Sequence, residues 1–71
     1  MQARSEETRT HILEAALRRF ANHGYSAASV DEICAEAGVS KGAFYHHFPS
    51  KQALFLELLN EWLDKIGRAH V

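Results

Sequence analysis

Residues 38–51 read GVSKGAFYHHFPSK and predict a very short helix set between two capping signals. Gly38 suits the left-handed conformation that ends a preceding helix, and Ser40 can cap the next one by accepting a backbone N–H. Pro49 then stops that helix, because its ring cannot continue the turn. A helix of about two turns buries little apolar surface, so we expect one of its faces to be presented to a partner.

The outer face of this short helix is slim and rich in hydrogen-bond donors. Gly42 and Ala43 keep it slim, whereas Lys41, Tyr45 and His46 supply donors. Glycine is costly inside a helix, which suggests that a partner approaches closely. The major groove of DNA accepts a helix of this kind and offers hydrogen-bond acceptors on the base edges. Double-stranded DNA is therefore the expected partner.

The charge distribution is compatible with phosphate contact, although the net charge is only −1. Between Glu36 and Glu57 there is no acidic residue, but four residues there can carry positive charge: Lys41, His46, His47 and Lys51. A locally positive face on a nearly neutral chain can attract an anionic partner. Charge alone decides little, because a stretch of this length can lack acidic residues by chance.

Several classes of protein are disfavoured by composition and motifs. The single cysteine, Cys34, excludes an internal disulfide and a multi-cysteine zinc site. No apolar run is long enough for a membrane span, and residues 1–10 are too polar for a secretory signal, so we expect a cytoplasmic protein without a membrane partner.

Adjacent helical residues such as His46 and His47 point about 100° apart and do not chelate one metal. Without a catalytic constellation, neither enzyme activity nor a cofactor is expected.

Hydrophobic periodicity predicts four helices and no strands, at about residues 5–23, 30–37, 41–48 and 51–66. Ser29 and Glu32 match a capping box before the second helix. Only residues 38–40 separate the second helix from the third, and a short turn with glycine is typical of a helix-turn-helix motif. The expected fold is all-α: a three-helix helix-turn-helix DNA-binding domain followed by a longer fourth helix. The DNA-binding domain is assigned to residues 1–58, and residues 59–71 are assigned to the remainder of the fourth helix, which leads toward a further domain. A plain four-helix bundle is the alternative, but its helices are usually longer than the third one here.

Apolar residues from all four segments are expected to converge on one core: Phe20, Tyr25, Ile33, Val39, Phe44, Phe48, Leu54 and Phe55. The fourth helix continues this apolar stripe beyond what three short helices can cover, through Leu58, Leu59, Trp62, Leu63 and Ile66. An exposed apolar stripe usually marks an interface. The alternative function is a protein-interaction module in which Leu58, Trp62 and Ile66 dock a partner helix.

The chain resembles the tetracycline-repressor (TetR) family of bacterial transcriptional regulators over about residues 8–58. Three blocks at the family's mutual distances support this resemblance: AGVS at 37–40, FYxxF at 44–48 and SKxxL at 50–54. The resemblance implies a homodimeric regulator, usually a repressor, that binds a palindromic operator and is released by a small-molecule effector. It also implies a second helical domain, missing from the 71 residues, that binds the effector and forms the dimer.

The resemblance also implies roles for individual residues. Tyr45 and Lys51 correspond to positions that contact phosphate, and Ser29 and Ser40 to cap positions that commonly meet phosphate. A lysine in the first turn of a helix faces the positive end of the helix dipole, which favours a bound anion near Lys51. The face that reads bases would consist of Lys41, Gly42, Ala43 and His46.

Overall fold

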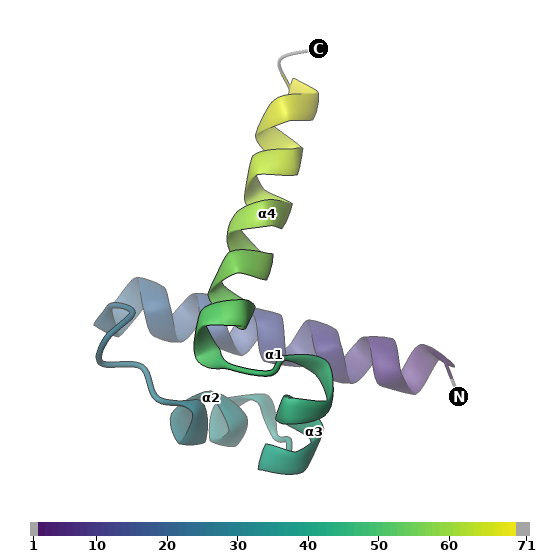
Figure 1. The fold of residues 1–71 in the computed structure, drawn as a ribbon, viewed down its shortest axis with the longest axis vertical. Coiled ribbons are helices and arrows are strands. Elements are labelled where there is room, and N and C mark those ends of the chain that lie inside the picture. Colours follow the sequence, from purple (N-terminus) through teal and green to yellow (C-terminus); the bar gives the residue numbers. More distant parts are fainter. Residues whose placement is uncertain (1, 70–71) are drawn as a thin grey trace.

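A computed structural model describes the backbone of residues 2–69 and the side chains of residues 6–64. Four helices follow one another: α1 (Gln2–His23), α2 (Val30–Ala37), α3 (Lys41–His47) and α4 (Lys51–Ala69). The short helices α2 and α3 pack against α1, as does the first part of α4, while the rest of α4 rises away from the other three helices (Figure 1). The predicted all-α helix-turn-helix architecture with a longer fourth helix is confirmed. No helix in this part of the chain is long and apolar enough to cross a membrane.

The helix bounds agree closely with those predicted, and the differences lie at the ends. The bounds of α2 are those predicted, while α1 begins three residues earlier and α4 continues to Ala69. The third helix ends at His47 because Phe48 adopts an extended conformation, with φ −136° and ψ 119°. Phe48 precedes Pro49, whose ring disfavours the helical conformation in the residue before it.

Local capping interactions define the start and end of α2. The Glu32 N–H donates to Ser29 Oγ at 3.1 Å, and the Ser29 N–H donates to Glu32 Oε1 at 3.2 Å, which completes the predicted capping box. At the other end Gly38 has φ +73°, and the Val39 N–H donates to the Cys34 carbonyl at 3.0 Å. Glycine adopts this left-handed conformation without steric cost. The turn into α3 is therefore set by the sequence itself.

The core lies where the four helices meet. It is formed by buried residues from each of them: Ile12, Leu13, Ala15, Ala16, Ile33, Cys34, Phe44, Phe48 and Leu54. Phe20, Val39 and Leu58 are partly buried against this cluster. The core is consequently built from α1, α2, α3 and only the first turns of α4.

Tyr25 and Phe55 were expected in the core, and the structure shows that this expectation was wrong. Both rings are more than one third exposed and form an aromatic cluster with Phe20, with ring centroids 5.1–5.7 Å apart. The reason is rotational: neighbouring residues of a helix point about 100° apart, so Leu54 faces the core and Phe55 cannot. Tyr25 lies in the loop after α1, where its ring contacts that of Phe55 outside the core.

Ion pairs connect α1 to its neighbours at the surface. Arg9 pairs with Glu57 and Glu61 of α4, while Arg18 and Arg19 pair with Glu36 of α2. Exposed pairs each contribute little to the free energy of unfolding. Their effect is mainly to favour one orientation of α2 and α4 against α1.

Candidate nucleic-acid interface

Two aromatic side chains hold α3 against the core. Phe44 is fully buried and Phe48 is 4% exposed, one helical turn apart. The residues on the rest of the helix surface are exposed to solvent: Lys41, Gly42, Tyr45 and His46. Phe44 and Phe48 thus anchor this helix of seven residues, while its polar side chains remain accessible to a partner.

Tyr45 combines exposure with a fixed position. Its ring packs edge-on against Phe44, with centroids 5.1 Å apart and an interplanar angle of 79°. The residue is nevertheless 48% exposed. The buried Phe44 ring therefore packs against the Tyr45 ring, and the phenol hydroxyl can donate a hydrogen bond to a partner.

Lys41 is paired with a carboxylate that the sequence analysis did not single out. Its Nζ lies 2.9 Å from Asp31 Oδ1, so the pair joins the first turn of α3 to the first turn of α2. The hydrogen bond to Asp31, and then its negative charge, raise the pKa of Lys41 above its ordinary value of 10.5. Short-range sequence patterns do not predict a contact between residues at the starts of two different helices, so only the folded structure reveals the Asp31–Lys41 pair.

Gly42 and Ala43 give α3 its slim surface. A Cβ added to Gly42 would lie 3.8 Å from Ser40 Oγ, which is ordinary contact. Among the residues whose side chains the structure describes, none requires glycine at this position. Ala43 is half-buried, and its N–H donates to Ser40 Oγ at 3.1 Å as part of the cap.

His46 is exposed at the end of α3, with its ring centroid 5.2 Å from that of His47. The two rings stand nearly perpendicular. Across the side chains that the structure describes, no group of three histidine, cysteine or carboxylate residues is arranged to hold a metal ion. The exposed imidazole of His46 lies at the solvent face of α3.

The two cap serines use only part of their hydrogen-bonding capacity within the fold. Ser29 Oγ accepts from the Glu32 N–H and Ser40 Oγ accepts from the Ala43 N–H. A hydroxyl that accepts in a cap still has its own hydrogen to donate. At Ser29 the backbone N–H is already engaged by Glu32, which leaves the hydroxyl as the donor for a partner.

Lys51 reaches from the first turn of α4 into the loop between α1 and α2. Its Nζ donates to the carbonyl oxygens of Tyr25 at 2.8 Å and Ala28 at 3.0 Å, and lies 4.2 Å from the centroid of the Tyr25 ring. These contacts explain how a cation is tolerated near the positive end of a helix. An ammonium group has three N–H donors, so one remains beyond the two carbonyls.

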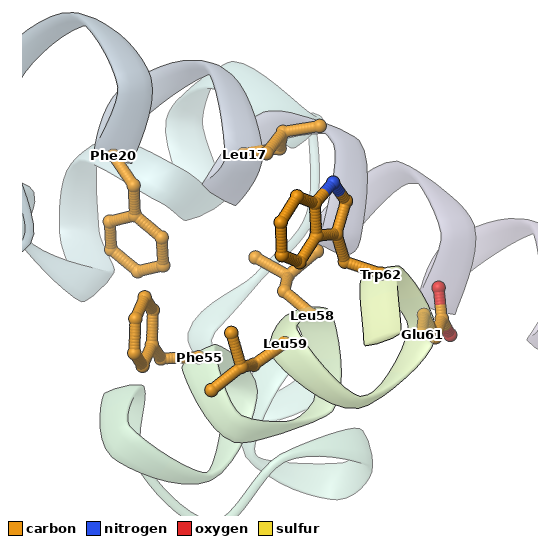
Figure 2. A pocket seen from close by; sticks show the side chains of 7 residues that line it. All are labelled: Leu17, Phe20, Phe55, Leu58, Leu59, Glu61 and Trp62. Carbon is orange, nitrogen blue, oxygen red and sulfur yellow. The ribbon is translucent and has the colours of Figure 1, made fainter. Parts of the chain in front are cut away.

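An open apolar groove lies between α1 and α4. Figure 2 shows its lining, Leu17 and Phe20 from α1 and Phe55, Leu58, Leu59, Glu61 and Trp62 from α4. Its volume is about 340 Å³. Leu17 and Trp62 are 58% and 60% exposed. Ile66, the last residue of the predicted stripe, lies outside the side chains that the structure describes.

Comparison with known proteins identifies the chain's relatives. The model of the family described as bacterial regulatory proteins, tetR family, matches residues 12–58. HTH-type transcriptional regulator YuxN of Bacillus subtilis is 56% identical over 54 residues, 76% of this chain and 19% of the relative. AcrR of Shigella flexneri, also an HTH-type transcriptional regulator, is 50% identical over 63 residues, 89% of this chain and 29% of the relative.

A third relative is the HTH-type transcriptional repressor AcnR of Corynebacterium efficiens, 48% identical over 54 residues, 76% of this chain and 29% of the relative. No solved structure matches the chain. The chain spans less than one third of the length of each of these relatives. Because the family model covers most of the sequence, from the buried Ile12 to the fourth helix, the chain belongs to the TetR family of bacterial regulatory proteins.

Proposed function

We propose that this chain is the DNA-binding part of a transcriptional regulator, most simply a repressor, and that α3 enters the major groove of its operator. The observation that carries the proposal is the division of residues 41–48 between two buried phenylalanines, Phe44 of α3 and Phe48 just after it, and an exposed polar surface. The names of the relatives, which are helix-turn-helix transcriptional regulators and include a repressor, support it. A bacterial regulator of this kind acts in the cytoplasm, where the chromosome lies.

The proposed contacts divide into two groups. The residues proposed to contact DNA phosphates are Ser29, Ser40, Tyr45 and Lys51. For Lys51 we propose that its remaining N–H meets phosphate while the two carbonyl contacts persist. The base-reading group consists of Lys41, Gly42, Ala43 and His46. Phosphate contacts position a protein on the duplex, and base contacts give it sequence preference.

The test is a selection of bound duplexes from a randomised library, followed by titrations at several salt concentrations. We expect an enriched sequence and an affinity that falls as salt rises, with a log–log slope of about 0.9 for each lysine–phosphate contact. Binding without sequence preference and without salt dependence would contradict the proposal. Enrichment of a sequence would identify the operator half-site.

We further propose that the apolar groove is covered by a second helical domain, and that residues 59–71 connect the DNA-binding domain of residues 1–58 to it. Seven groove residues with a 60% exposed tryptophan are unusual on the surface of a small domain. The relatives are more than three times as long as the parts that this chain matches, which leaves room for such a domain. In this proposal the second domain forms the homodimer and binds the small-molecule effector.

A dimer would hold two α3 helices about one turn of DNA apart, on a palindromic site. We expect the 71-residue chain to sediment as a monomer and to bind a half-site weakly. Joining two copies should strengthen binding to the full palindrome far more than binding to a half-site, because the second contact becomes effectively intramolecular. Equal affinity for the half-site and the palindrome would contradict the dimer proposal.

The groove also supports a second candidate function, a protein-interaction module that docks a partner helix against Leu58 and Trp62. The two functions differ in their dependence on salt. Phosphate contact releases counterions and gives a steep slope, whereas apolar docking does not. Trp62 fluorescence during a DNA titration adds a second measurement. It should stay unchanged if DNA binds at α3, because the groove that contains Trp62 then remains uncovered.

A further inference from the structure

The contact between Asp31 and Lys41 lies at the surface that the proposed function assigns to DNA. Asp31 is 74% exposed and Lys41 59% exposed, and Nζ and Oδ1 are 2.9 Å apart. An ion pair that is this open to water contributes little to stability. Its main consequence is instead electrostatic, because it places the negative charge of Asp31 beside the ammonium of Lys41, the residue that begins α3.

A carboxylate beside a lysine affects its two possible DNA ligands differently. Guanine O6 and N7 are uncharged acceptors, and the ammonium of Lys41 can donate to them while another of its N–H groups stays on Asp31. A phosphate oxygen is anionic and would be brought close to the Asp31 carboxylate. Like charges at such distances repel, most strongly where little water separates them. Asp31 therefore disfavours phosphate as a ligand of Lys41 more than it disfavours a base edge.

On this basis, and resting on the proposed DNA-binding function, we propose that Asp31 is a specificity-determining residue that directs Lys41 toward bases and away from phosphates. Asp31 acts through Lys41, as a positioning residue, and its removal releases the lysine to bind any duplex. The raised pKa of Lys41, caused first by its hydrogen bond to Asp31, is consistent with this coupling. Asp31 also suits the positive end of the α2 dipole. That role does not depend on Lys41, so a comparison in the absence of Lys41 separates it from the coupling.

The experiment compares the wild-type chain with Asp31→Asn on a mixed-sequence duplex of about 20 base pairs, two helical turns. We expect Asp31→Asn to bind this duplex roughly five times more tightly at about 0.1 M salt, with a log–log salt slope steeper by about 0.9, because one more lysine contacts phosphate. In a randomised selection, preference at the base pair read by Lys41 should become weaker.

Two controls separate this effect from general charge and from folding. Glu14→Gln removes one exposed carboxylate from α1 while the Asp31–Lys41 pair is left intact, so it should change affinity by less than about twofold in salt. In a Lys41→Ala background, Asp31→Asn should have no further effect on the mixed-sequence duplex. NMR titration of the Lys41 ε-methylene without DNA should show a lower lysine pKa in Asp31→Asn than in the wild type, which verifies the pair itself.

The outcomes distinguish this inference from the proposed function. If the wild type shows no salt-dependent binding to duplex DNA, the proposed function fails and the inference fails with it. If the wild type binds but Asp31→Asn behaves like Glu14→Gln, or retains its effect without Lys41, the inference alone is overturned. Loss of preference for a cytosine in Asp31→Asn, without tighter mixed-sequence binding, would also overturn it, since Asp31 would then contact a base directly.

Discussion

Lys51 of α4 and Tyr25 of the α1–α2 loop are joined twice, by a hydrogen bond from Nζ to the Tyr25 carbonyl at 2.8 Å and by the position of the ammonium 4.2 Å from the ring centroid. The loop that Lys51 holds also contains Ser29, the N-cap of α2. A single side chain at the start of α4 thereby connects the fourth helix to the segment that positions the helix-turn-helix motif.

Replacing Lys51 with alanine is expected to affect both folding and DNA binding. Loss of two hydrogen bonds from a charged donor should lower the free energy of unfolding by about 1–2 kcal/mol. Binding to all duplexes should weaken alike, and the salt slope should fall by about one. Urea unfolding and salt-dependent titration measure the two effects. Lower stability with an unchanged slope would assign Lys51 to the fold alone.

Tyr45→Phe tests a phosphate contact without changing charge. The ring and its packing on Phe44 are retained, so the free energy of unfolding should stay the same. Loss of one hydroxyl donor should weaken binding by about 0.5–1.5 kcal/mol for every duplex sequence. The salt slope should remain as in the wild type, in contrast to Lys51→Ala. A change in preference at one base pair would instead show that Tyr45 reads a base.

Lys41→Ala is expected to alter sequence preference. A lysine that donates to guanine O6 and N7 discriminates against other bases by about 1–3 kcal/mol. The profile of the binding site, measured by selection, should therefore lose preference at one position in each half-site. The same profile for Lys51→Ala is the comparison and should be unaltered. Preference retained at every position would exclude Lys41 as a base-reading residue.

Gly42→Ala should stabilise the protein and weaken its DNA binding. The new Cβ has only ordinary contact with Ser40 Oγ, and alanine is favoured over glycine within a helix by about 1 kcal/mol. The unfolding midpoint should accordingly rise. DNA that approaches the backbone at this position would meet the added methyl group, so affinity should fall. Unchanged affinity in the stabilised variant would mean that DNA does not come close to Gly42.

Glu36 predicts a dependence of stability on pH. Its hydrogen bond with Arg18, followed by the charges of Arg18 and Arg19, lowers its pKa below the ordinary value of 4.5. A carboxyl with a depressed pKa in the folded state stabilises the protein above its unfolded-state pKa, and this contribution is lost as pH falls through the folded-state value. The stability difference between the wild type and Glu36→Gln should therefore be largest above pH 4.5, and it should disappear as the pH falls below that value.

Unfolding both proteins from about pH 6 to about pH 3, a range that spans ordinary carboxyl pKa values, measures this difference. The other carboxylates titrate in both proteins, so they largely cancel in the comparison. A constant difference across this range would show that the Arg18–Glu36 contact does not contribute through the charge of Glu36.

Much of the fold was predictable because its signals are local. The capping box at Ser29, the glycine at 38 and the proline at 49 each act within a few residues, and they set the limits of α2 and α3. Helical spacing likewise predicted the burial of Phe44 and the exposure of Lys41, Tyr45 and His46, whereas Ala43, expected on the outer face, is half-buried. Tyr25 and Phe55 were misplaced because hydrophobicity indicates that a residue prefers burial, but not whether its place on a helix or in a loop directs it toward the core.

The sequence by itself determined the four helices, the turn between α2 and α3 and the burial of Phe44, since capping and helical periodicity depend on near neighbours. Only the tertiary structure decided how the two lysines are partnered. Lys41 meets Asp31 of another helix and Lys51 meets the carbonyls of a distant loop, contacts that exist because packing brings separate elements together. Electrostatic interactions act through space, so the charge that the proposed interface offers to DNA is a property of the folded chain.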